Sequence, residues 1–170
     1  MTDNAKMIQA LTRESERIEE DSIHSAKGHF NAGDTWRRRH CWIGIPATVL
    51  GAGTGAAIVK GCPELAGLLS LAATILTALV TFLKPSERAS AHKTAGDQYL
   101  ALRNDARFFR EIQMLESEES CNHSEELKSL AQRRNELNQG SPEIPRRAFV
   151  KARQGIDEGE TQYRADKEKP

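Results

Sequence analysis

Residues 41–83 form the longest apolar stretch of the chain, and charged residues are dense on both sides of it. Two runs within it, residues 42–59 and 65–83, contain no Asp, Glu, Lys, Arg or His. As helices, runs of 18 and 19 residues would be about 27–28 Å long. That length is close to the hydrocarbon thickness of a bilayer, in which only helices and closed barrels satisfy the backbone polar groups. The pattern predicts a transmembrane helical hairpin, broken at residues 60–64.

The alternative is a pair of buried helices in a soluble core. Such helices usually keep a polar face, and neither run has a charged position. A charge at the centre of a membrane helix costs about 2.5–3.5 kcal/mol on insertion scales, a constraint that a soluble helix does not share. The total absence of charge therefore favours the membrane.

The residues that flank the two runs predict the orientation of the hairpin. Basic residues gather outside the runs, whereas Lys60 in the connecting loop is offset by Glu64. An excess of Lys and Arg marks the cytoplasmic side, and tryptophan favours the membrane interface. We therefore expect a multi-pass membrane protein with both termini in the cytoplasm. The membrane-flanking residues are Trp36, Arg37, Arg38, Arg39, Trp42, Lys84 and Arg88.

Small and hydroxyl-bearing residues recur at helical spacing in the two runs. In the first run, Ala47, Gly51 and Gly55 predict a face for close helix contact, within the hairpin or between subunits. The second run carries a hydroxyl stripe, which consists of Ser70, Thr74, Thr77 and Thr81. These hydroxyls either bond back to the preceding turn at a helix contact or line a narrow aqueous path in an oligomer. The stripe is therefore the candidate pore lining.

Outside the hairpin the chain reads as helices, so the predicted fold class is all-α. We expect one domain over residues 1–170, with an N-terminal cytosolic helix over 4–35, the hairpin over 42–83 and a cytosolic helical region over 85–165. The first helix has a thin apolar stripe, and the helix after Pro85 has a near-heptad stripe that suits a bundle or an oligomer seam. That second stripe, the predicted cytosolic packing or oligomer face, consists of Ala95, Tyr99, Leu102, Ala106, Phe109 and Ile112. Further helices are expected from an N-cap at Ser124 to residues 138–140, and from Pro145 onward with Tyr163 on the apolar face.

Composition adds little chemistry to this picture. The formal net charge is zero, and the chain has three cysteines and five histidines. Neither follows a metal-site or nucleophile motif, and residues 51–55 do not continue as a phosphate loop. Cys121 and His123 suggest a ligand pair, but a solvated loop is the better interpretation because no second pair accompanies them. Arg103, Arg107 and Arg110 share a helix face that suits either an anionic ligand or a salt-linked surface. We expect no catalytic residue, metal, cofactor or nucleic acid partner.

These features favour an oligomeric membrane effector that forms a pore or disrupts the membrane. The alternative is a non-conducting anchor or scaffold that recruits a partner protein to the bilayer.

Several motifs, in this order, resemble the SLATT family of bacterial conflict systems. They are LKPSER at residues 83–88, His92 followed by YLALRNDARF at 99–108, Leu137-Asn138 with Pro142 to Pro145, and ARQGI at 152–156 with Gly159, Glu160 and Tyr163. The resemblance covers about residues 5–165. It implies a two-transmembrane-helix effector of antiphage defence that acts at the bacterial inner (cell) membrane and causes cell death or growth arrest by abortive infection. It also implies a trigger. Because this sequence carries no fused sensor domain, we expect the trigger to come from a separate sensor or nucleotide-signal system, or from a ligand bound by the cytosolic helices themselves.

Overall fold

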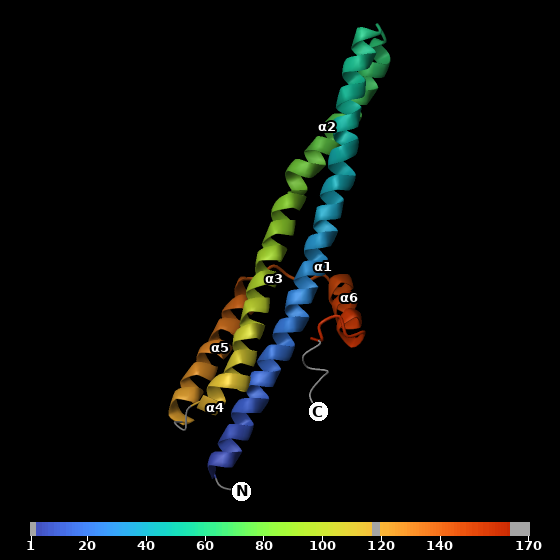
Figure 1. Cartoon of the computed structure of the whole chain (residues 1–170). Helices are drawn as coiled ribbons and strands as arrows, with labels where there is room; N and C mark the ends of the chain where they lie inside the picture. The colour runs from blue at the N-terminus through green and yellow to red at the C-terminus, as the bar shows by residue number, and fades with distance from the viewer. Residues whose placement is uncertain (1–2, 117–119, 164–170) are drawn as a thin grey trace. The chain divides into compact units, whose positions relative to one another are not determined.

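The computed structural model describes residues 3–116 and 120–163, and every regular element in these residues is helical. The elements are α1 (Asp3–Val59), α2 (Pro63–Leu83), α3 (Pro85–Phe108), the π-helix η1 (Phe109–Gln113), α4 (Met114–Glu116), α5 (Ser120–Gly140) and α6 (Arg146–Asp157) (Figure 1). The all-α prediction is thereby confirmed for the described part of the chain. Of the polar break expected at residues 117–123, residues 117–119 lie outside the described residues, whereas 120–123 belong to the helix α5, so that part of the expectation is wrong. The charged tail expected at 165–170 also lies outside the described residues.

The chain divides into two compact units, and helices α1 and α3 contribute to both. Unit 1 comprises residues 1–32 and 91–170, and unit 2 comprises residues 33–90. The helix predicted over 4–35 and the first predicted membrane helix are one continuous helix, α1. Gly28, Gly33 and Asp34 lie within it without ending it, since a single glycine costs a helix only about 1 kcal/mol. Pro46 consequently lies inside a helix.

Unit 2 consists of the end of α1, the helix α2 and the start of α3. Gly61 in the turn between α1 and α2 has a φ of 72°, a left-handed conformation that glycine adopts without steric cost. At the other end of α2, Lys84 takes φ 45°, and its backbone N–H donates to Val80 O at 3.0 Å. Proline follows at once as the first residue of α3, where a missing N–H is tolerated. Pro85 thus marks the end of α2, as the sequence predicts.

Unit 1 has a core built where α1, α3, η1 and α5 meet. Phe109 is its largest fully buried side chain. The core cluster consists of Leu11, Ile18, Leu102, Ala106, Phe109, Leu127 and Leu130. Ser124, predicted as an N-cap, lies inside α5, which begins four residues earlier at Ser120. The C-terminal segment also differs from expectation, because α6 ends at Asp157 and Tyr163 lies beyond the helix.

Candidate functional site

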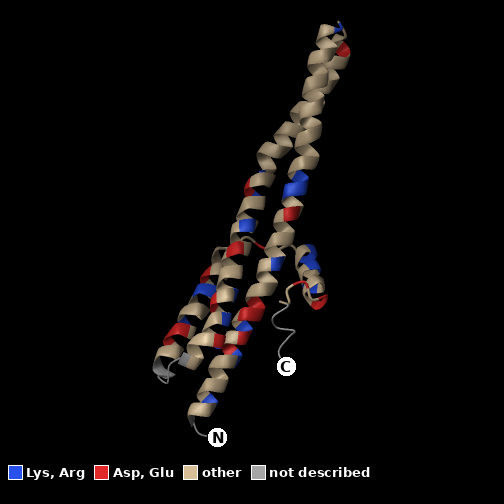
Figure 2. Cartoon of the chain, viewed as in Figure 1, with Lys and Arg blue, Asp and Glu red and all other residues tan. Residues whose placement is uncertain are grey.

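The surface of unit 2 is the first candidate site, because it exposes a long apolar stretch. Two helices, α1 and the one that begins at Pro63, are long and apolar enough to cross a membrane by length and composition. Only 6% of the most apolar window of each is buried within the chain. Figure 2 shows that the charged residues of unit 2 lie near the two ends of the helix pair, with an uncharged stretch between them. Twelve large apolar side chains are exposed there: Trp42, Ile45, Val49, Ile58, Val59, Leu65, Leu68, Leu71, Ile75, Leu79, Phe82 and Leu83.

The contact between α1 and α2 uses a different set of small residues from the predicted one. A Cβ placed on Gly53 would lie 3.4 Å from Leu69 Cδ1, and Ala57 and Ala66 are buried. By contrast, a Cβ on Gly51 or Gly55 would have no neighbour within 4 Å. Gly51 and Gly55 thus meet no helix partner within the single chain, and the contact face formed by Ala47, Gly51 and Gly55 stays a prediction.

The hydroxyl stripe of α2 lies on the exposed side of the helix. Its four members, Ser70, Thr74, Thr77 and Thr81, are exposed in the single chain. Each threonine donates its hydroxyl hydrogen bond to the preceding turn: Thr74 to Ser70 O at 2.8 Å, Thr77 to Ala73 O at 2.8 Å and Thr81 to Thr77 O at 2.9 Å. This leaves the hydroxyl oxygens as acceptors on the outer surface of α2.

The predicted membrane-flanking residues lie where unit 2 carries its charge. Arg37 pairs with Asp34 at 3.0 Å and Lys84 pairs with Glu87 at 3.1 Å. Arg38 is exposed, and Trp42 is 80% exposed. The other three members, Trp36, Arg39 and Arg88, contact one another, because the guanidinium carbons of both arginines lie over the indole ring, at 4.7 and 4.8 Å from its centre.

The predicted cytosolic packing face lies largely inside unit 1. Ala95, Tyr99, Leu102, Ala106 and Phe109 are at most 3% exposed. Ile112, the last member, is 41% exposed and lies in the π-helix η1. In the single chain the stripe therefore packs on the chain's own helices, and only its end is open to another subunit.

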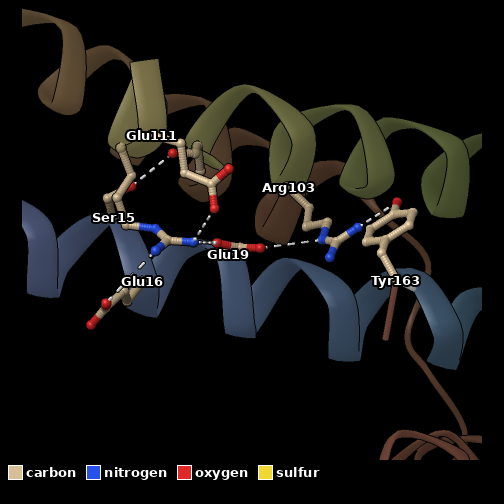
Figure 3. A network of polar contacts seen from close by, with 8 residues as sticks. Ser15, Glu16, Glu19, Arg103, Glu111 and Tyr163 are labelled. Carbon is tan, nitrogen blue, oxygen red and sulfur yellow. Dashed lines mark hydrogen bonds and ion pairs between the residues drawn. The ribbon is translucent and has the colours of Figure 1, made fainter. Parts of the chain in front are cut away.

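A polar network crosses the interface between α1 and α3 in unit 1 (Figure 3). Glu19 receives an ion pair from Arg103 at 3.5 Å and a hydrogen bond from Arg110 at 2.9 Å. Ser15, fully buried, donates to Ala106 O at 2.8 Å. Arg103 is only 7% exposed, so it does not belong to a solvated surface. Arg133, by contrast, forms its ion pair on the exposed surface. The carboxylate of Glu19 thus pairs with Arg103 and Arg110, two of the three arginines for which the sequence suggests either an anionic ligand or a salt-linked surface.

The segment after α6 contacts this network through Tyr163. Arg103 Nη1 donates to the hydroxyl oxygen of Tyr163 at 2.8 Å. The guanidinium carbons of Arg103 and Arg107 lie 4.9 and 4.8 Å from the centre of the tyrosine ring. Glu160 forms an ion pair with Lys27 of α1. Residues 160–163 therefore fasten the end of the chain to α1 and α3.

A buried histidine pair links α1 to α3 near the boundary of unit 1. His29 Nδ1 and His92 Nδ1 are 3.0 Å apart, so one ring donates a hydrogen bond and the other accepts it. Burial, and then the proximity of His92, lowers the pKa of His29 to about 4, and burial also lowers the pKa of His92. Tyr99 stacks on His29 with ring centres 5.5 Å apart, and its hydroxyl donates to Asn138 Oδ1 at 2.7 Å. Burial raises the pKa of Tyr99.

Sequence reasoning missed the roles of Ser15, Glu19, His29 and His92. One signal was available for two of them: Ser15 and His29 continue the buried stripe of α1, which also includes Leu11, Ile18, Ser22 and Ala26. Nothing in the local pattern pairs these residues with their particular partners on the opposite helices α3 and η1. The solvated loop expected at 121–123 is wrong, since these residues belong to α5 and His123 is buried, with Nε2 3.1 Å from Gln113 O. The alternative ligand pair finds no support, and the side chain of Cys121 lies outside the described part.

Two open pockets of unit 1 share Ser25 and Asn138, and the smaller one adjoins His29 of the histidine pair. The smaller, about 340 Å³, is lined by Ser25, His29, Tyr99, Asn138, Ser141, Pro142, Glu143 and Ile144. The larger, about 480 Å³, is lined by Glu20, Asp21, His24, Ser25, Asn138, Phe149 and Arg153. Among the described residues, no group of three or more His, Cys, Asp or Glu side chains is placed to hold a metal ion.

Comparison with known proteins adds no relative: no protein-family model, curated protein or solved structure matches the chain.

Proposed function

We propose that residues 42–83 cross the bacterial inner membrane twice, with both termini in the cytoplasm. The observation that carries this proposal is the set of twelve large apolar side chains exposed on unit 2. Burying one such side chain stabilises a protein by about 1.5–3 kcal/mol, so leaving all of them in water is strongly unfavourable. A bilayer covers them at once. The basic residues next to the helices, three of them consecutive at 37–39, support the cytoplasmic placement of the termini.

The inserted protein acts, in this proposal, as a non-enzymatic homo-oligomeric effector. After a trigger it forms a pore or disrupts the inner membrane, and the cell dies or stops growing as part of antiphage defence. The resemblance to the SLATT family supports this role, as do two faces of unit 2 that the single chain leaves open, the small-residue face at Gly51 and Gly55 and the hydroxyl stripe. The trigger comes from a separate sensor or nucleotide-signal system.

Dye leakage from liposomes tests the pore, with the oligomeric mass measured in detergent. The purified protein is reconstituted with small and large dyes, and leakage is compared with that of a variant carrying Thr74→Leu and Thr77→Leu. A pore lined by the stripe loses leakage in this variant. The matched control carries Thr48→Leu and Thr54→Leu, which remove two back-bonded hydroxyls from α1 and leave the stripe intact. Equal leakage by all three proteins, with equal insertion, contradicts the pore lining.

The alternative function is a non-conducting anchor that recruits a partner protein. One observation favours it: the threonine hydroxyls of the stripe donate their hydrogen bonds to carbonyl oxygens of their own helix. Hydroxyls at lipid-facing or packed positions bond in the same way, without lining a pore. Replacing residues 42–59 and 65–83 by neutral poly-leucine helices separates the two functions. An anchor keeps its cellular activity after this replacement, whereas a pore loses it.

A further inference from the structure

A pair of arginines converges on one tryptophan beside the proposed membrane segment. The guanidinium carbon of Arg39 lies 4.7 Å from the centre of the Trp36 indole, and that of Arg88 lies 4.8 Å from it. Trp36 and Arg39 belong to α1 and Arg88 belongs to α3, so the cluster joins the two helices within unit 2. Both arginines are exposed. The cluster therefore places two cations from different helices at one exposed spot.

The charge of this cluster is not balanced within unit 2, whose residues 33–90 are all described. Its neighbours Arg37 and Lys84 each have a carboxylate partner, at 3.0 and 3.1 Å. Arg39 and Arg88 have no ion pair in this unit, and their contact is with the aromatic ring. A guanidinium attracted to an aromatic ring keeps N–H groups with which it can donate to a bidentate acceptor such as phosphate.

The sequence positions of the cluster indicate its depth in the membrane, and therefore which acceptor it meets. Arg39 precedes the first uncharged run by three residues, and Arg88 follows the second run by five. Residues at these positions lie at headgroup level if the two runs span the hydrocarbon, and tryptophan is favoured at that level. The acceptor available at that depth is the phosphodiester of a phospholipid.

We propose that Trp36, Arg39 and Arg88 form a binding site for the headgroup phosphate of an anionic phospholipid in the cytoplasmic leaflet. This inference rests on the proposed membrane insertion. The site prefers anionic over zwitterionic lipid because the two guanidinium groups are positively charged and lack a carboxylate partner. The positive choline of a zwitterionic headgroup repels them, whereas an anionic headgroup has a net negative charge that attracts them. An attraction of about 1 kcal/mol per basic residue at a membrane surface corresponds to about fivefold in affinity for each arginine.

Tryptophan fluorescence reports on the site directly. The chain has two tryptophans, so Trp42→Phe leaves Trp36 as the only reporter. The full-length protein in neutral detergent is titrated with a short-chain phosphatidylglycerol and, separately, with the matching phosphatidylcholine. We expect saturable change in Trp36 emission and at least tenfold tighter binding of phosphatidylglycerol. Equal affinity for the two lipids overturns the proposal.

Charge variants locate the effect. Arg39→Gln with Arg88→Gln lowers the affinity for phosphatidylglycerol about twentyfold. The control, Arg146→Gln with Arg147→Gln, removes the same charge from exposed positions of unit 1 and leaves the affinity unchanged. Equal loss in both variants reduces the site to general charge attraction and overturns it. Substitution by lysine at 39 and 88 keeps the charge without the planar fork, so it restores part of the affinity in a correctly folded protein.

Two further experiments distinguish a lipid site from a free-phosphate site, and failure of the headgroup site from failure of membrane insertion. Inorganic phosphate added as a competitor displaces phosphatidylglycerol at equal concentration only if the site takes free phosphate, a result that contradicts a lipid site. Flotation with neutral phosphatidylcholine vesicles tests insertion itself. A wild-type protein that does not float disproves the membrane proposal, whereas one that floats but shows no lipid preference in detergent disproves the headgroup site alone.

Discussion

Acidification should weaken unit 1 through the histidine pair. Two imidazoles whose Nδ1 atoms are 3.0 Å apart share one hydrogen bond only while at least one of them is neutral. If both become protonated, both Nδ1 atoms carry hydrogen and two positive charges face each other in a buried place. His29 is 2% exposed and His92 4% exposed, so water does little to relieve that repulsion. The groups packed around them are Tyr99 and Asn138, with Glu143 on the wall of the adjoining pocket.

The sign and size of the effect follow from the pKa of His29. Its folded-state pKa of about 4 lies below the ordinary value of 6.5, so the unfolded chain binds more protons between these two pH values. The stabilisation is fully present above about pH 6.5 and is lost as the pH falls toward 4. Linkage gives a loss of about 2 kcal/mol in unfolding free energy between pH 7.5 and pH 5.0 from His29. The lowered pKa of His92 acts in the same direction.

The assay is guanidinium-induced unfolding in neutral detergent, followed by circular dichroism at 222 nm at pH 7.5 and pH 5.0. The double variant His29→Gln with His92→Gln should lose most of the pH dependence that distinguishes the wild type. His24→Gln removes an imidazole from the same helix outside the pair and serves as the control, with the wild-type pH dependence expected. If the wild type and the double variant lose equal unfolding free energy at pH 5.0, the histidine pair is not the acid-sensitive element.

The same unfolding measurement tests three contacts of unit 1. Glu19→Gln leaves two arginines without their carboxylate and should lower the unfolding free energy by about 3 kcal/mol. Glu16→Gln, at an exposed pair, should lower it by less than about 0.5 kcal/mol, and equal losses refute the network. Gly96→Ala drives a methyl group to 2.7 Å from a phenylalanine ring of α1 and should cost about 1–2 kcal/mol, while Gly140→Ala, which meets nothing within 4 Å, should be neutral or stabilising. Tyr163→Phe should cost about 1 kcal/mol by removing the hydroxyl that accepts from a buried guanidinium, and no change means that this hydrogen bond does not stabilise the bundle.

Periodicity predicted the helical faces well because a face depends only on local spacing. The stripe from Ala95 to Phe109 is buried along its length, since apolar residues 3 or 4 apart must share one side of a helix. Likewise, the four hydroxyl residues of α2 lie on one exposed side. Charge patterning also marked the ends of the apolar runs, because the absence of charge is itself a local property.

Register between distant helices was beyond the reach of local patterns. His29 contacts His92, 63 residues away, and Glu19 contacts Arg110, 91 residues away. Such pairs depend on how far α1 slides along α3, which the packing of the whole core decides. Tyr163 shows the same limit: its spacing fits the face of α6, but the helix ends at Asp157, and Gly159 takes a left-handed φ of 82°.

The continuity of α1 was also missed, for a reason of energy. Glycine and aspartate at 28, 33 and 34 are weak helix formers, yet each costs no more than about 1 kcal/mol in a helix interior. Burial of Gly28 and Gly33 in the chain offsets such a cost. Propensity alone therefore suggested an interruption that packing overrides.

The double crossing of the membrane is the central claim, and one labelling experiment tests it most directly. Cys62 lies in the turn between α1 and α2 and is exposed. In a variant with Cys41→Ser and Cys121→Ser it is the only thiol, and spheroplasts expressing this variant are treated with a membrane-impermeant maleimide. If the hairpin spans the membrane with cytoplasmic termini, Cys62 is labelled in intact spheroplasts. Labelling that appears only after lysis contradicts the account.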